Sequence, residues 1–232
     1  MRNTQKLLAA GMLAFGISFT ASILNGQNDR FDHKVRNDFF AGFGGDREAF
    51  ARGMKAAAET IAANPNHAEA LVWHGGGLYF QAGAAFQRGD SAKGMELYQK
   101  GMAQMNRAVE IAPDNIGVRI PRAAILLAAT SFQQMDERVE GEIRSAIADY
   151  LRAYDLQKAQ FSSLGEHPLG ELLKGLGDGY SRLGEKDKAK VYFDQIEELL
   201  PKSEYAKRAA SWKKNGTLTM EERQCYGCHV GK

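Results

Sequence analysis

The stretch from Leu172 to Pro201 limits the fold of this chain more than any other. Small, apolar and aromatic residues recur there at helical spacing, in the order Leu176, Gly177, Tyr180, Leu183, Gly184, Ala189, Phe193 and Pro201. Gly177 has no side chain, so a second helix can come close to it. Phe193, on that second helix, is expected to pack against Gly177. Gly184 favours the end of the first helix. Pro201 favours the end of the second, because the residue before a proline avoids the helical region. The pattern therefore predicts two antiparallel helices packed face to face.

A looser version of the same hairpin runs from Pro65 to Pro113, with a turn at Gly89-Asp90. The two prolines are 48 positions apart, whereas a compact hairpin repeat of this kind takes about 34. The simplest explanation is that each of its two helices is longer by about two turns. The interior Gly75-Gly76-Gly77 then lies within a helix and favours close helix packing. It is not a phosphate-binding loop, since no Lys-Ser or Lys-Thr follows it.

Helices are also expected on both sides of this central pair. Upstream, Asp46 has a side chain suited to cap a helix that runs to about Ala63. Downstream, apolar positions at helical spacing predict a further long pair over 116–133 and 136–160. Residues 161–168, which include serine and glycine, are expected to form a loop.

Residues 45–215 resemble the tetratricopeptide-repeat (TPR) family, and the order of residues within 172–201 carries the resemblance most specifically. The resemblance implies an all-α fold, a right-handed solenoid of about four helix pairs with a concave and a convex face. It also implies a groove that binds protein partners. Residues 23–44 are then expected to form a linker, not folded around 25–36, and residues 216–232 a separate C-terminal segment.

That C-terminal segment holds the only two cysteines of the chain, in Cys225-Tyr226-Gly227-Cys228-His229. C-x-x-C-H is the spacing of covalent haem attachment. Two thiols form thioethers with the haem vinyl groups, and the adjacent imidazole binds the iron. The motif predicts one haem c, with Cys225 and Cys228 as covalent attachments and His229 as the proximal iron ligand.

Three other interpretations of the two cysteines are a zinc site, a redox pair and a disulfide. A structural zinc site needs four Cys or His ligands, and only three are local here. A thioredoxin-like pair needs a strand before it, and nothing near Cys225 alternates as a strand does. A disulfide between Cys225 and Cys228 is the third interpretation, in an oxidising compartment.

The resemblance to c-type cytochromes covers only the last dozen residues, and the motif stands in an unusual place. Small cytochromes carry it near their start and take a sixth iron ligand from a methionine farther along. Here only Val230, Gly231 and Lys232 follow it. A sixth ligand is therefore expected from upstream, from another subunit, or not at all. The upstream candidates are Met220, which also suits an apolar contact, and His167, in the expected loop.

Three other histidines have simpler interpretations. His67 lies in a turn between expected helices, where a polar residue needs no further role. His74 falls at a helix-packing position beside Trp73, which is typical of a hydrogen-bonded core histidine. His33 lies in the expected linker. None of the three is predicted to bind iron.

The N-terminus has the pattern of an export signal. Arg2 and Lys6 precede an uncharged stretch over 7–24, and Ser22 suits the last position before a cleavage site. This predicts a signal peptide over 1–22. The uncharged stretch has 18 residues, which reaches the lower length for a membrane-spanning helix, so an uncleaved anchor is the alternative. Both place the rest of the chain in the periplasm or on the outer face of the cytoplasmic membrane.

Charge excludes some function classes. The chain has 30 Lys and Arg and 28 Asp and Glu. Without the two cations of the export signal it is neutral, which gives no reason to expect nucleic-acid binding. Residues 136–142 carry a group of acidic side chains with Arg138 among them, which is typical of a charged helix face rather than of a paired-carboxylate site. Cations predominate after residue 201. They are typical either of a collar that steers an acidic redox partner or of a solvated helix face; they are Lys202, Lys207, Arg208, Lys213, Lys214, Arg223 and Lys232.

Two functions follow from these features. The first is an electron carrier of the cell envelope, in which the repeat domain docks the protein in a redox complex and the haem passes electrons. The second is a periplasmic protein-binding or assembly scaffold, in which the cysteine motif holds a disulfide or a metal. No hydrolase, kinase or metalloprotease motif is present, so neither is a catalyst. A peroxidase needs a distal acid-base group, and the sequence suggests none.

Overall fold

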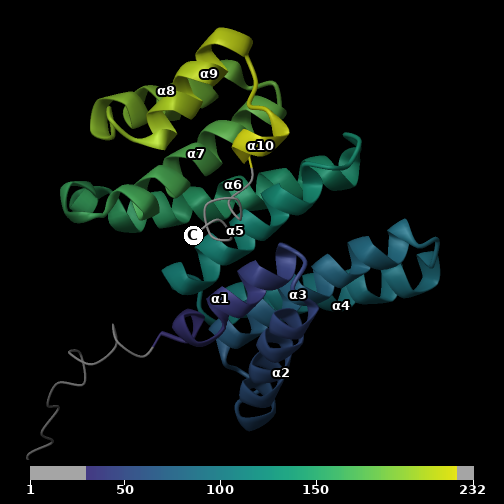
Figure 1. Cartoon of the computed structure of the whole chain (residues 1–232). Helices are drawn as coiled ribbons and strands as arrows, with labels where there is room; N and C mark the ends of the chain where they lie inside the picture. Colours follow the sequence, from purple (N-terminus) through teal and green to yellow (C-terminus); the bar gives the residue numbers. More distant parts are fainter. Residues whose placement is uncertain (1–29, 224–232) are drawn as a thin grey trace, which may run out of the picture. The chain divides into compact units, whose positions relative to one another are not determined.

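The computed structural model describes residues 30–223, which form ten α-helices and one 3₁₀ helix and contain no β-strand (Figure 1). In chain order the elements are α1 (Asp32–Phe43), α2 (Arg47–Ala63), α3 (Ala68–Gln87), α4 (Ser91–Ile111), α5 (Ile116–Thr130), α6 (Glu137–Gln157), η1 (Lys158–Ser163), α7 (Glu166–Arg182), α8 (Lys186–Leu199), α9 (Glu204–Asn215) and α10 (Met220–Arg223). The prediction of an all-α fold is confirmed for this part of the chain.

The helices pack as neighbouring pairs. The closest contacts join α1 to α2, α3 to α4, α5 to α6 and α7 to α8, and α9 packs against α8. The first helices of successive pairs also touch, because α3 contacts α5, α5 contacts α7 and α7 contacts α9. Figure 1 shows these pairs following one another along the chain. Helices α3, α5 and α7 thus lie side by side in sequence order.

Side-chain caps fix where several helices begin. The Asp46 carboxylate accepts a hydrogen bond from the Ala49 N–H at 2.9 Å, which confirms the predicted start of α2. Asp90 and Asp136 cap α4 and α6 in the same way. At the other end of α7, Gly184 adopts φ of +76°, a left-handed conformation that ends the helix without strain. Helix boundaries are therefore set locally, by residues that the sequence displays.

Glycines set the distance between paired helices. A Cβ on Gly75 would lie 2.7 Å from the carbonyl oxygen of Gly101, so α3 and α4 are in backbone contact there. A Cβ on Gly177 would lie 2.7 Å from the Phe193 ring, so that ring occupies the space above the glycine. The predicted contact between Gly177 and Phe193 is confirmed. The α3–α4 pair is also the longer one, with helices of 20 and 21 residues.

Two segments differ from the sequence-based prediction. Residues 23–44 were expected to be a linker, yet α1 occupies most of it, with Phe31, Val35 and Phe39 buried in the core. These apolar residues are four apart, so they share one helix face. The loop expected over 161–168 is replaced by the end of η1 and the first turn of α7. Pro168 is tolerated there, because the first turn of a helix has no partner for its missing N–H.

Candidate functional site

The predicted haem ligands Cys225, Cys228 and His229 lie outside the described residues, and so does the expected export signal over 1–22. The last described residue is Arg223, two residues before Cys225. The structure therefore shows how the chain reaches the motif, and that approach is the candidate site.

The chain after α9 turns back onto the helical domain. Gly216 adopts φ of +72° and ends α9, and its carbonyl oxygen accepts a hydrogen bond from the Lys186 ammonium. Leu218 is then buried. A reciprocal cap starts α10, in which the Thr219 N–H donates to the Glu222 carboxylate at 2.7 Å and the Glu222 N–H donates to the Thr219 hydroxyl at 3.3 Å. Each of these contacts restricts the path towards residue 223.

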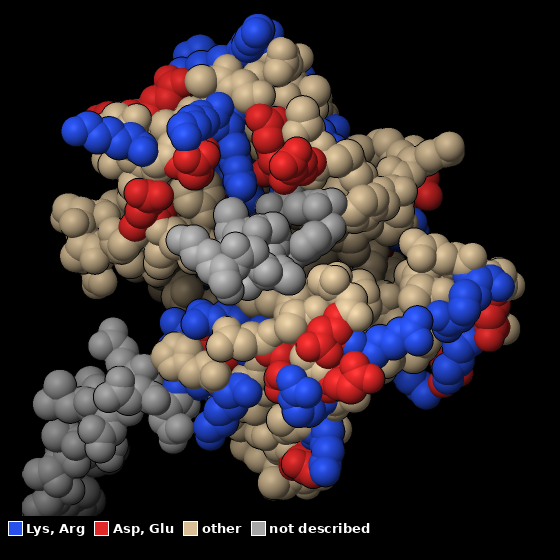
Figure 2. Space-filling view, viewed as in Figure 1, with Lys and Arg blue, Asp and Glu red and all other residues tan. Residues whose placement is uncertain are grey.

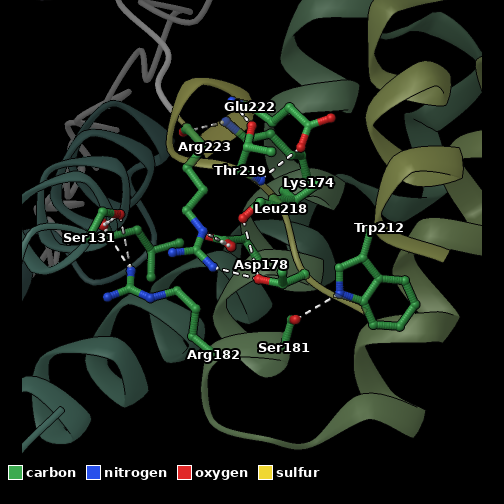
Figure 3. A network of polar contacts seen from close by, with 12 residues as sticks. Ser131, Lys174, Asp178, Ser181, Arg182, Trp212, Leu218, Thr219, Glu222 and Arg223 are labelled. Carbon is green, nitrogen blue, oxygen red and sulfur yellow. Dashed lines mark hydrogen bonds and ion pairs between the residues drawn. The ribbon is translucent and has the colours of Figure 1, made fainter. Parts of the chain in front are cut away.

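Arg223 completes the attachment through an ion pair with α7. Its Nε lies 3.1 Å from Oδ1 of Asp178, and the two side chains are 17% and 4% exposed. The guanidinium also donates to the Thr217 hydroxyl at 2.9 Å, and the Lys174 ammonium donates to the Arg223 carbonyl oxygen at 3.4 Å. Figure 3 shows Arg223 extended from α10 towards Asp178. The residue that leads into the cysteine motif is therefore fixed on α7.

Asp178 and Lys174 belong to a line of charged residues on one face of α7, which we call the α7 polar row: Glu171, Lys174, Asp178 and Arg182. Their spacing of three or four residues places them one above the other. Lys174 lies 3.2 Å from the Glu171 carboxylate, and both are buried. Arg182 donates to the Leu127 carbonyl oxygen at 2.9 Å and thereby links α7 to the end of α5. The row thus joins α5, α7 and α10.

Burial governs the electrostatics of this row. It raises the pKa of the Asp178 carboxyl, and the positive charges of Arg223, Arg182 and Lys174 oppose that rise. Burial likewise lowers the pKa of the Arg182 guanidinium, while Asp178 raises it. The Asp178 carboxylate holds the neighbouring cations in place, because removing it would leave Arg223 and Arg182 partly buried without this counter-charge.

Small apolar residues surround the ion pair. Ala124, Leu127 and Ala128 of α5 line a cavity beside Arg223, together with Tyr150 of α6 and residues of the α7 polar row. The cavity measures about 10 Å³, which is room for about one water molecule. It is far too small to enclose a haem.

The two candidates for a sixth iron ligand lie in different places. Met220 is in α10, with 39% of its surface exposed, three residues before Arg223. His167 is in the first turn of α7, where its Nδ1 lies 2.8 Å from the Tyr205 hydroxyl. It precedes Asp178 by 11 residues, about 16 Å along the helix. Met220 therefore lies close to the approach to the motif, whereas His167 is hydrogen-bonded at a distance from it.

The simpler interpretations of His67 and His74 agree with the structure. His67 is the N-cap of α3, where its Nδ1 accepts a hydrogen bond from the Ala70 N–H at 3.2 Å. Nδ1 of His74 lies 2.7 Å from the Gln104 side-chain oxygen, between α3 and α4. Both histidines are accounted for by helix capping and helix packing.

The acidic group at 136–142 was expected to form a charged helix face, and one of its members departs from that expectation. Glu142 is buried, and its carboxylate accepts hydrogen bonds from the Tyr79 hydroxyl at 2.6 Å and the Tyr98 hydroxyl at 2.8 Å. Arg138 also donates to it, at 2.7 Å. The tyrosines come from α3 and α4, so Glu142 ties the second helix pair to α6. No local sequence signal separates it from the exposed acids beside it.

Several cations of the expected C-terminal collar have acidic partners. Arg223 pairs with Asp178, and Lys213 lies 2.6 Å from Asp194 and 2.5 Å from Glu197. Figure 2 shows basic and acidic side chains interspersed over the visible face. These ion pairs reduce the positive charge that the collar can present to a partner.

Among residues 30–223, no cluster of three or more His, Cys, Asp or Glu side chains is arranged to bind a metal ion. No helix in the same range has the length and hydropathy needed to cross a membrane. No model of a known protein family matches the chain, and no curated protein matches it either. The function is therefore inferred from the motif and from the geometry that leads to it.

Proposed function

We propose that this chain is an exported monohaem c-type cytochrome that transfers electrons in the cell envelope. Cys225 and Cys228 form the thioethers of one haem c, and His229 is the proximal iron ligand. The observation that carries the proposal is the C-x-x-C-H sequence placed two residues after Arg223, which the helical domain holds by a largely buried ion pair. A carrier needs its cofactor at a defined place, and an attachment of the chain just before the motif supports such a role.

The described residues suit a surface haem. Haem has an apolar ring and two acidic propionates. Ala124 and Ala128 are partly exposed apolar residues of α5, and Lys174 and Arg182 lie beside them on α7, each close to an acidic residue of the same row. When bound, the haem would supply one-electron redox chemistry. The residues of the chain would attach the haem, exclude water from one side of it and balance the charge of its propionates.

The helix pairs support a docking role for the rest of the molecule. Helices α3, α5 and α7 touch in sequence order, as expected for a right-handed TPR-like solenoid. We propose that this domain binds protein partners of a cell-envelope redox complex. Residues 1–22 act as a signal peptide or an uncleaved anchor, which places the domain in the periplasm or on the outer face of the cytoplasmic membrane.

The test is a visible spectrum of the denatured full-length protein, purified from cells that express the cytochrome c maturation machinery. We expect a haem band that stays with the denatured chain and is lost in the double variant Cys225→Ala/Cys228→Ala. A colourless wild-type protein would contradict the proposal. The function would then be that of a periplasmic scaffold in which the cysteine pair holds a disulfide or a metal.

A further inference from the structure

The path of the chain after α9 leads along α7. Gly216 contacts Lys186 just beyond the C-terminal end of α7, whereas Arg223 contacts Asp178 and Lys174 in the middle of that helix. Between Arg182 and Lys174 the helix advances by about 12 Å. Residues 216–223 therefore run from the end of α7 back towards its N-terminus, over the face that also contacts α5.

The contacts of Arg223 with α7 favour this direction. Its ion pair with Asp178 is mostly removed from water, since the carboxylate is 4% exposed. Releasing Arg223 would leave Asp178 buried beside fewer cations, which is costly. Leu218 adds apolar contact a few residues earlier, with 2% of its surface exposed. The chain therefore leaves α10 from a point held against α7.

The next residues have limited reach. A chain spans at most about 3.6 Å per residue, so the Cα of Cys225 lies within about 7 Å of the Cα of Arg223, and that of His229 within about 22 Å. Within this reach are Ala124, Leu127 and Ala128 of α5, which line the cavity beside the ion pair. The segment 224–229 is itself nearly uncharged, with the sequence Gln-Cys-Tyr-Gly-Cys-His. Residues 224–229 are therefore long enough to contact these α5 residues, and their lack of charge suits an apolar contact.

We propose that the face of α5 and α7 around the Asp178–Arg223 ion pair is the docking surface for residues 224–229 of the same chain. The first helices of successive pairs line this face, which is where a helical-repeat domain would otherwise hold a partner peptide. When residues 224–229 of the same chain occupy this face, a partner peptide cannot bind there. A redox partner must then bind to another part of the molecule. The inference deepens the proposed function by placing the motif on the domain, but the docking itself does not require an attached haem.

The test is site-specific photo-cross-linking in the full chain. Tyr226, between the two cysteines, is replaced by the photoreactive residue p-benzoylphenylalanine, and cross-linked peptides are identified by mass spectrometry. We expect intramolecular cross-links to the α5 segment around 124–128 or to 171–178 of α7, with a yield that does not depend on protein concentration. Cross-links only to other helices, only between copies of the chain, or none at all would overturn the proposal.

Two background variants test the role of the ion pair. With Asp178→Asn we expect the yield of cross-links to α5 and α7 to fall about tenfold. Arg223→Gln should lower the yield as much, by removing the less buried partner of the same ion pair. Asp194→Asn removes exposed ion pairs with Lys190 and Lys213, and it should leave the yield unchanged. Far-UV circular dichroism confirms that each variant is folded. An unchanged yield in folded Arg223→Gln would contradict an attachment through this pair.

Haem attachment is measured separately, on the denatured chain. Cross-links to α5 and α7 in a protein without haem would support the docking and contradict the proposed electron transfer. Covalent haem combined with cross-links elsewhere would support electron transfer and contradict the docking.

Discussion

Nε of Arg223 lies 3.1 Å from Oδ1 of Asp178, and this contact joins the last described turn of the chain to the middle of α7. The two residues are 45 positions apart in the sequence. Residues 216–223 are therefore part of the helical domain and not a separate tail, although the sequence suggested a C-terminal segment that begins at 216.

The first prediction concerns proteolysis after Arg223. Trypsin must take the Arg223 side chain into its own acidic pocket, so it competes with Asp178 for the guanidinium. We expect Asp178→Asn to raise the rate of cleavage after Arg223 by about tenfold in the native protein, because loss of a buried counter-charge releases the arginine. Time-resolved mass spectrometry of the digest measures the rate.

Asp194→Asn is the matched control for this experiment, because Asp194 also pairs with two cations but is 43% exposed. Its cleavage after Arg223 should equal that of the wild type. Equal rates in Asp178→Asn and the wild type would show that the ion pair does not restrain residue 223.

A second prediction tests the glycine in the α7–α8 hairpin. A Cβ on Gly177 would lie 2.7 Å from the Phe193 ring, which is fully buried and has little room to move. We expect Gly177→Ala to lower the free energy of unfolding by about 1–3 kcal/mol, as overpacking does. Gly83→Ala in α3 is the control, since no atom lies within 4 Å of its added Cβ. That variant should gain about 0.5–1 kcal/mol from helix propensity. Denaturant unfolding measures the free energy of unfolding of both variants. If Gly177→Ala were as stable as the wild type, the close packing of Gly177 against Phe193 would be contradicted.

Local signals explain how much of the fold the sequence predicts. Asp46, Asp90 and Asp136 begin helices by capping their own first turns, and Gly184 ends one, so each boundary depends on residues a few positions apart. The same logic could have found α1, since Phe31, Val35 and Phe39 are spaced for one helix face. Charged residues between these positions concealed the pattern.

The candidate site depends on contacts that spacing does not encode. Nothing near Arg223 indicates that its partner is Asp178, and an acid on α7 has the same local appearance whether it faces water or a buried cation. Glu142 shows the same limit, because its burial comes from tyrosines on α3 and α4. Sequence periodicity predicts which helices form, whereas the pairing of charges between helices requires the three-dimensional arrangement.

A third prediction concerns Glu142. Its carboxylate is the shared acceptor of the Tyr79 and Tyr98 hydroxyls and of Arg138. Glu142→Ala leaves these donors without their acceptor in a buried place, so we expect a loss of about 2–4 kcal/mol in the free energy of unfolding. Glu140→Ala, two residues earlier, removes a largely exposed ion pair with Arg144 and should cost less than about 0.5 kcal/mol. Similar losses in the two variants would show that the Glu142 network does not stabilise the fold.

The last prediction concerns stability at alkaline pH. Burial, with smaller contributions from Tyr180, Tyr154 and Asp155, raises the pKa of Tyr192 to about 12, whereas an unfolded tyrosine titrates near about 10. The folded state therefore keeps this proton longer, and the resulting stability is complete below about pH 10 and is lost as the pH rises from about 10 to about 12. Tyr192→Phe has no proton to lose, so its free energy of unfolding should fall less steeply than that of the wild type over this range. Burial also raises the pKa of Tyr79, so some decline should remain in the variant.

Denaturant unfolding at several pH values measures both slopes, with about pH 8 as the reference at which neither tyrosine titrates. Parallel curves for the two proteins between about pH 10 and about pH 12 would contradict a raised pKa at Tyr192.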